Sequence, residues 1–134
     1  MTHKNFSSGT PWEPLVGYSR AVRVGGQVFV SGTTASDEHG QVQCPGDAYG
    51  QTRYILNKIQ AALAGCQATL ADVVRTRIFV TDIDQWEAIG RAHSEFFGEI
   101  RPACTMVEVS RLVGADLLVE IEADAVVSKP QPEA

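Results

Sequence analysis

Residues 102–123, PACTMVEVSRLVGADLLVEIEA, decide the fold of this chain, because they hold two strand-like runs joined by a short linker. The runs are residues 103–109 and 117–125, with Gly114 and Asp116 in the linker. Side chains alternate between the two faces of a strand. The pattern therefore predicts acidic side chains on one face, at Glu108 in the first run and at Glu120, Glu122 and Asp124 in the second. An ionised carboxylate is stable in water but needs a partner or a shifted pKa in a closed interface.

Upstream, the sequence predicts a β-hairpin followed by a long helix. Residues 20–24 and 27–33 are β-type runs separated by Gly25 and Gly26, which is a typical hairpin signal. Residues 47–66 carry apolar side chains at spacings of three and four, so they form one buried stripe on an amphipathic helix.

The middle of the chain predicts one more strand and one more helix. Residues 73–81 alternate as a strand does. A second helix is expected to start at the capping residue Asp84 and to end at Gly98, with a buried stripe of Trp86, Ile89, His93, Phe96 and Phe97. Residues 1–17 are expected to form an arm or short edge strand, and residues 128–134 a tail without a pattern. The order β-β-α-β-α-β-β predicts an α+β fold with one sheet and both helices on one face.

Size and composition limit the class of protein. A chain of 134 residues fits a single domain, 1–134. Apolar content of 44% and charged content of 20% are ordinary for a globular protein. No apolar run approaches the ~20 residues that cross a bilayer, and the N-terminus lacks the apolar core of a secretory signal. We therefore expect no membrane association and a cytoplasmic location.

Charge and cysteine usage argue against three further classes. The net charge is −5 and the eleven basic residues are scattered, whereas nucleic-acid binding needs a basic face. The three cysteines, Cys44, Cys66 and Cys104, are odd in number and widely spaced, and the histidines lie at no ligand-like spacing from them. We expect no nucleic-acid partner, no disulfide framework and no metal.

The second face of the predicted sheet has nothing to cover it. Its strands carry apolar residues, namely Phe29, Met106, Leu118 and Val126. Exposed apolar patches beyond a few hundred Å² usually mark an interface. The pattern therefore predicts an oligomer.

Several short motifs also occur in a recognisable order. They are Tyr18-Ser19, Val28-Phe29-Val30-Ser31-Gly32, Phe79-Val80-Thr81-Asp82 and the closing VEIEA at residues 119–123. With the segment at 102–123, they resemble the Rid family of reactive-intermediate deaminases, also called the YjgF family, over residues 18–127. The resemblance implies the chorismate-mutase-like fold and a homotrimer with clefts between neighbouring subunits. It also implies hydrolysis of a small enamine or imine with release of ammonia, without a cofactor.

The same resemblance assigns roles to particular residues. Glu120 matches the family's glutamate that orients or activates water, a role that suits a carboxylate desolvated in a cleft. From the residues alone, the preferred interpretation of Glu120 is a solvated strand carboxylate, and only the motif favours the catalytic role. Tyr18 and Ser31 match positions that bind substrate or close the pocket, although each could be structural. Met106 falls where the family uses main-chain groups to hold the intermediate and water.

Cys104 departs from the family pattern. Family deaminases have arginine in this position, where its guanidinium grips a substrate carboxylate in a bidentate fork. Removing one member of such a pair costs about 2–5 kcal/mol, so a typical 2-imino acid should bind poorly. Cys104 could instead be a nucleophile, but the nearest histidine in sequence, His93, lies on an apolar helix stripe. A small, neutral lining of the pocket is the preferred interpretation.

Three functions stay open from the sequence. The first is a deaminase acting on a small enamine or imine that needs no arginine-bound carboxylate. The second is a trimer that binds a small molecule without catalysis. The third, an endoribonuclease or translation inhibitor, has its support only in descriptions of some family members, and the charge distribution opposes it.

Overall fold

A computed structural model describes residues 3–128, which form one six-stranded sheet and three α-helices. Two short 3₁₀ turns, Leu70–Asp72 and Ile83–Gln85, lie before and after β4. The elements are β1 (His3–Phe6), α1 (Trp12–Val16), β2 (Ala21–Val24), β3 (Gln27–Thr34), α2 (Ala48–Gly65), β4 (Val73–Val80), α3 (Trp86–Phe97), β5 (Ala103–Glu108) and β6 (Val119–Val126). Of the tail predicted for residues 128–134, only Ser128 lies within the described residues.

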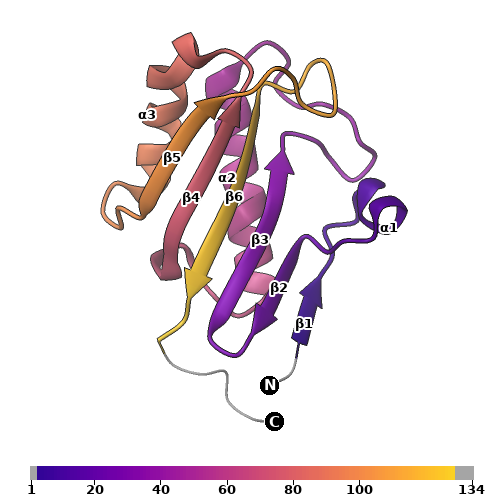
Figure 1. Ribbon diagram of the computed structural model, residues 1–134, viewed down its shortest axis with the longest axis vertical. Helices are drawn as coiled ribbons and strands as arrows, with labels where there is room; N and C mark the ends of the chain where they lie inside the picture. Colours follow the sequence, from indigo (N-terminus) through magenta and orange to yellow (C-terminus); the bar gives the residue numbers. More distant parts are fainter. Residues whose placement is uncertain (1–2, 129–134) are drawn as a thin grey trace.

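The strands are arranged in the order β1-β2-β3-β6-β4-β5, so the last strand of the chain lies near the middle of the sheet (Figure 1). All neighbouring strands are antiparallel except β4 and β5, which are parallel and are joined through α3. A parallel pair needs such a crossover connection. The predicted two-residue hairpin at Gly25 and Gly26 is confirmed between β2 and β3.

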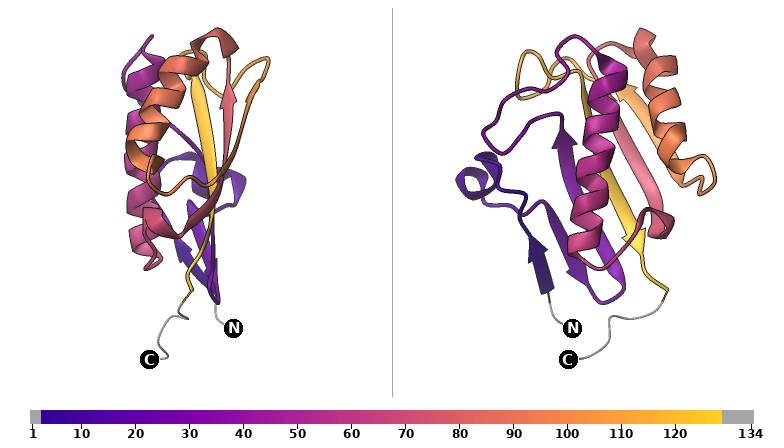
Figure 2. Two further views of the ribbon diagram at one scale, coloured as in Figure 1. Left: turned by 90° about the vertical axis from the view of Figure 1, so that its left-hand side faces the viewer. Right: turned by 180° about the vertical axis from the view of Figure 1, so that it is seen from behind.

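Both long helices pack on the same face of the sheet, as the sequence predicted (Figure 2). Helix α2 buries its predicted stripe, including Ile55, Leu56, Ile59 and Leu63. These side chains meet the inward residues of the central strands, such as Val30 and Ile121. Asp47 caps the helix by accepting a hydrogen bond from the Gly50 backbone N–H at 2.9 Å.

The structure confirms one expected element at the N-terminus and adds one that was not predicted. Residues 3–6 form the edge strand β1, which agrees with the expected arm or short edge strand, but α1 was not predicted. This helix has only five residues and contains Pro14, and its apolar residues Leu15 and Val16 are exposed. It therefore has none of the periodicity that marks an amphipathic helix.

The start of α3 differs from the prediction at two residues. Trp86 is 56% exposed instead of buried, because the first turn of α3 extends beyond the ends of the neighbouring strands (Figure 1). The buried positions are Ile89, Ala92 and Phe97. Asp84 is not the cap of α3 either: the N-cap is Gln85, which makes no side-chain cap hydrogen bond. Asp82 instead caps the preceding 3₁₀ turn, where its side chain accepts from the Asp84 backbone N–H at 3.0 Å.

The face of the sheet opposite the helices, here called the open face, carries three of the four predicted acidic residues. Glu108 was expected on the same face, but it pairs with the buried Val80 of β4 and therefore lies on the helix side of the sheet. Along β6 the buried Val119, Ile121 and Ala123 alternate with Glu120, Glu122 and Asp124. On the same face, the Arg77 Nη1 donates to Glu122 and Asp124, each at 3.1 Å. Two of the three carboxylates are therefore paired with a cation on the open face.

The apolar residues assigned to the open face divide into two groups. Phe29 and Val126 are 46% and 48% exposed, as expected. Met106 and Leu118 instead pack against the core. The reason for Met106 is its register: it pairs with the buried Ile78, and partners in adjacent strands share a face.

Among residues 3–128, no helix has both the length and the apolar character that crossing a membrane requires.

Candidate functional site

A pocket of about 500 Å³ lies on the open face, between the ends of three strands and α1. It is lined by Trp12, Val16, Tyr18, Arg20, Ser31, Gly32, Thr34, Val113, Glu120 and Glu122. Three residues predicted from the sequence, Tyr18, Ser31 and Glu120, therefore lie in one cavity. They come from the segment before β2, from β3 and from β6, which pair side by side in the sheet.

Glu120 lies in this pocket beside an irregularity in the β3–β6 pairing. The register shifts between Val30 and Thr33, so that Glu120 comes to lie opposite Thr34. Its carboxylate also lies beside Gly32: a Cβ placed there would be 2.1 Å from the Glu120 Oε2. Such a close approach is possible only because glycine has no side chain.

The surroundings of Glu120 make its carboxylate easier to protonate than that of an exposed glutamate. Burial raises its pKa, the positive charge of Arg20 opposes that rise, and the neighbouring Glu122 adds to it. A carboxylate with a raised pKa is a better general base near neutral pH, because its affinity for a proton is higher.

The hydroxyl groups of Tyr18 and Ser31 have defined partners. Ser31 Oγ donates to the Ser19 carbonyl at 2.7 Å, so its oxygen can only accept a hydrogen bond from a ligand. Tyr18 Oη accepts from Arg20 Nη2 at 3.3 Å. Its own proton is then available to be donated, so the pocket offers one acceptor and one donor.

Arg20 is a pocket residue that the sequence analysis did not assign to the site. Its side chain is only 3% exposed. Nη1 donates to the Gly32 carbonyl at 2.6 Å and to Thr33 Oγ1 at 3.2 Å, and Nε donates to Ser8 Oγ at 3.3 Å. One signal could have found it: Arg20 is two residues after Tyr18, and residues two apart in an extended segment share a face.

Glu13 on α1 compensates the charge of this buried arginine. Glu13 Oε2 lies 3.9 Å from Arg20 Nη2 and accepts the hydroxyl protons of Ser8 and Thr10 at 2.6 and 2.7 Å. Burial alone would raise the pKa of Glu13, but hydrogen bonds from Ser8, Thr10 and Ser7 outweigh it and hold the pKa at about 2. The carboxylate is therefore charged at neutral pH, which fixes α1 against the segment that leads into β2.

The other two predicted site residues, Cys104 and Met106, lie elsewhere in the chain. Both are on β5, and β4 separates that strand from β6. One chain alone therefore does not bring them together with Glu120. Because β5 is an edge strand, its outer main-chain groups are free to bind a ligand or another chain.

His93 is packed rather than free to act as a base for Cys104. Its Nε2 lies 3.0 Å from Thr76 Oγ1, and its ring contacts that of Phe97, with centroids 4.7 Å apart. Burial lowers the pKa of His93, so the ring is neutral at physiological pH. This arrangement agrees with the interpretation of His93 as a core histidine.

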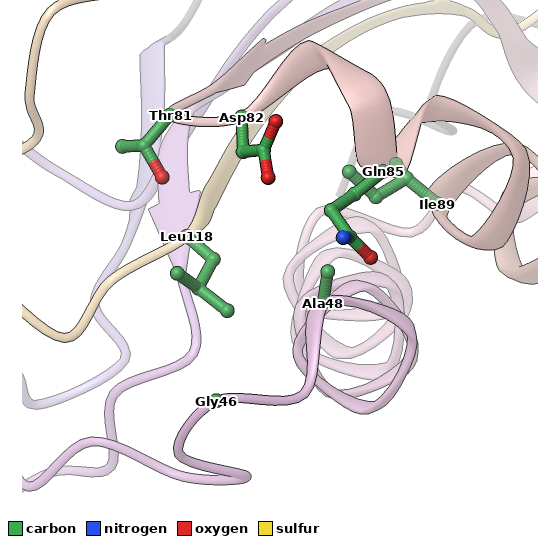
Figure 3. Close-up of a pocket in the computed structure, with 7 residues that line it drawn as sticks. All are labelled: Gly46, Ala48, Thr81, Asp82, Gln85, Ile89 and Leu118. Carbon is green, nitrogen blue, oxygen red and sulfur yellow. The ribbon is translucent and has the colours of Figure 1, made fainter.

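A smaller pocket of about 190 Å³ lies where β4 ends and α2 begins (Figure 3). Its lining includes Thr81 and Asp82, which belong to one of the sequence motifs. Asp82 is the only ionisable residue in that lining, and its carboxylate caps the following turn. This pocket therefore lacks the combination of base, donor and acceptor found around Glu120.

Within residues 3–128, no group of three or more His, Cys, Asp or Glu side chains is placed to hold a metal ion.

Comparisons with known proteins agree with this fold and with these motifs. Residues 10–127 match the family described as Endoribonuclease L-PSP, and the chain belongs to that family, which includes the YjgF and RutC proteins. The chain is 40% identical to the 3-aminoacrylate deaminase RutC of Acinetobacter baylyi, over 84% of this chain and 88% of that protein.

Two solved structures are also similar. One is a YjgF/YER057c/UK114 family member from Mycobacterium tuberculosis, with 52% identity and a TM-score of 0.85 over 94% of this chain and 100% of that one. The other is described as a putative endoribonuclease from Thermotoga maritima, with 32% identity and a TM-score of 0.86 over 96% and 100% of the two chains. The relatives therefore carry two different activity names.

Proposed function

We propose that the protein hydrolyses a small enamine or imine and releases ammonia, at the pocket around Glu120. The observation that carries this proposal is a half-buried carboxylate with a raised pKa, beside one hydrogen-bond donor and one acceptor. The similarity to a protein named 3-aminoacrylate deaminase supports the same reaction class.

The reaction requires water to add to a C=N carbon. Glu120 accepts a proton from that water as its oxygen bonds to carbon, and it passes this proton to the imine nitrogen. Glu120 then takes the O–H proton of the resulting carbinolamine and gives it to the nitrogen as the C–N bond breaks, which yields a carbonyl compound and ammonia. Ser31 Oγ can accept a hydrogen bond from an N–H of the substrate. The Tyr18 hydroxyl can donate to the oxygen of the carbinolamine as that oxygen becomes the carbonyl. An enamine first becomes the imine by gaining a proton on carbon and losing one from nitrogen.

The lining of the pocket favours a substrate with an apolar substituent. Trp12, Val16 and Val113 supply apolar surface, whereas position 104 offers no guanidinium to bind a carboxylate. A typical 2-imino acid is therefore expected to be a poor substrate. A neutral imine or enamine fits the pocket better.

The proposal includes a homotrimer with sites between subunits. Val16 and Val113 line the pocket yet are 72% and 71% exposed, so one wall is left open to water in a single chain. A second copy could cover that wall and supply the edge of β5 with Cys104 and Met106. The proposal also includes a small-molecule ligand and a cytoplasmic location. It includes no cofactor, no nucleic-acid partner and no membrane partner.

Ammonia release tests the proposed reaction. Acetophenone imine is a neutral, apolar probe, and 2-iminopropanoate generated in situ is the matched carboxylate probe. We expect the protein to accelerate hydrolysis of the first above the uncatalysed rate and the second weakly or not at all.

Two other outcomes would identify the competing functions. A small molecule retained by the purified protein and seen by mass spectrometry, without turnover of either probe, would indicate a binding protein. Cleavage of single-stranded RNA that survives Glu120→Gln would indicate a ribonuclease with a different site.

A further inference from the structure

We infer that Arg20 is a positioning residue for the Glu120 site, because its guanidinium directs the Tyr18 hydroxyl and places a fixed positive charge behind Gly32. The expected effect of Arg20 on the rate of hydrolysis rests on the proposed function. Its effect on Glu120 can be measured without any turnover.

The first part of the argument is that Arg20 is already held by the protein. Nη1 and Nε donate to Gly32 O, Thr33 Oγ1 and Ser8 Oγ, at 2.6, 3.2 and 3.3 Å. An arginine with these donors engaged, and 3% exposed, cannot swing out to grip a ligand. It therefore acts through its neighbours and is not a replacement for the arginine missing at position 104.

The first neighbour is Tyr18. Arginine can only donate, so the Tyr18 oxygen is the acceptor in the 3.3 Å contact with Nη2. The guanidinium carbon also lies 5.5 Å from the centre of the Tyr18 ring. Both contacts hold the phenol in one place and leave its proton free to be donated into the pocket.

The second neighbour is Glu120. Arg20 binds the carbonyl of Gly32, and the Glu120 carboxylate occupies the space beside the Cα of the same glycine. Four other charged groups, two acidic and two basic, lie around Glu120 and Arg20. Glu122 faces Glu120 along β6 and is paired with Arg77, whereas Glu13 and Lys58 face Arg20.

The charge of Arg20 lowers the pKa of Glu120 against the effect of burial. Removing the charge should therefore raise that pKa further. The carboxylate form would then be lost at a higher pH, so the acidic limb of the pH–rate profile should move to higher pH.

The test compares Arg20→Gln, Arg20→Lys and the control Arg77→Gln by NMR titration of the Glu120 carboxyl carbon. Arg77 lies on the same open face but pairs with Glu122 and Asp124 instead. We expect the Glu120 titration to move to higher pH in Arg20→Gln and to stay near the wild-type position in Arg20→Lys. Arg77→Gln leaves Glu122 unpaired and should move the titration less than Arg20→Gln does, because the effect of Glu122 on Glu120 is smaller than that of Arg20. An unmoved titration in a folded Arg20→Gln would overturn the inference.

Turnover of acetophenone imine provides the second readout. In Arg20→Lys the charge remains but the contact with Tyr18 is lost, so kcat should fall roughly fivefold to tenfold, as for one hydrogen bond, with the acidic limb in place. Tyr18→Phe should reduce kcat similarly, and the double variant no further. If Arg20→Gln does not fold, a fully active Arg20→Lys overturns the inference. If wild type has no turnover, the proposed function fails while the titration still decides the role of Arg20.

Discussion

The carboxylate of Glu120 occupies the space that a side chain on Gly32 would need. A Cβ built on Gly32 would lie 2.1 Å from Oε2 and 3.0 Å from Cδ of Glu120. Real Cβ atoms essentially never approach other atoms so closely. The position of the proposed base therefore depends on the absence of a side chain one strand away.

Gly32→Ala should reduce turnover while the protein stays folded. The added methyl group meets the flexible end of Glu120, so the carboxylate can move aside, but a displacement of about 1 Å can cost roughly 100-fold in rate. We expect kcat with acetophenone imine to fall by one to two orders of magnitude, with an unchanged circular dichroism spectrum.

Gly90→Ala is the matched control for that substitution. A Cβ at Gly90 meets nothing within 4 Å, and Gly90 lies inside α3. The Gly90→Ala variant should keep wild-type activity and gain about 0.5–1 kcal/mol in stability, because alanine has a higher helix propensity than glycine. Wild-type turnover in Gly32→Ala would show that the position of Glu120 does not matter.

Glu13 should make the protein less stable as the solution becomes acidic. Its pKa falls from 4.5 to about 2 on folding, which corresponds to about 3 kcal/mol of stabilisation. Because the folded pKa is the lower one, this stabilisation is fully present above pH 4.5 and is lost as the pH falls toward 2.

Urea unfolding at a series of pH values tests this role. Glu13→Gln should be less stable than wild type at pH 7, and its stability should change less between pH 4.5 and 2. The exposed Glu38→Gln is the control and should follow wild type. Identical pH profiles for wild type and Glu13→Gln would contradict the role of this carboxylate.

The protein should be a homotrimer in dilute solution, because the open face and one wall of the pocket lack a cover in a single chain. Light scattering should give three times the chain mass of 14.5 kDa. A stable 14.5 kDa species would remove the shared site and leave Cys104 and Met106 without a role.

Cys104→Arg should add activity toward a carboxylate substrate. If a neighbouring copy brings β5 to the pocket, a guanidinium there can bind the carboxylate in a bidentate fork. We expect hydrolysis of 2-iminopropanoate to rise by about one to three orders of magnitude, in line with about 2–5 kcal/mol for a buried charge pair. Cys104→Ala adds no cation and should match wild type. If Cys104→Arg gains no activity, the weak hydrolysis of 2-iminopropanoate must have its cause elsewhere in the site.

Much of the fold could be predicted because its signals are local. The alternation along β6 and the stripe of α2 each follow from one short segment whose buried face matches its period. Helix α1 and the exposure of Trp86 could not be predicted in this way. Both depend on where an element ends relative to the sheet, which is a property of the whole assembly.

The candidate site divides along the same line. Tyr18, Ser31 and Glu120 were found through motifs, and the structure brings them into one pocket. Arg20 and Glu13 were missed, because their roles depend on contacts between segments: Glu13 on α1 meets Arg20 before β2, and Arg20 meets Gly32 on β3. No periodicity in a single segment encodes such contacts, and only the two-residue spacing from Tyr18 pointed to Arg20.

The most direct test of the account is ammonia release from acetophenone imine by wild type, Glu120→Gln and Glu122→Gln. Glu120→Gln keeps the size of the side chain but removes the base, so it should lower kcat by about two to four orders of magnitude. Glu122 lies on the same face but is paired with Arg77, so Glu122→Gln should have a smaller effect. Folding and oligomeric state should be unchanged in both variants. Equal activity in Glu120→Gln and wild type would contradict the assignment of Glu120 as the base, and with it the proposed hydrolysis.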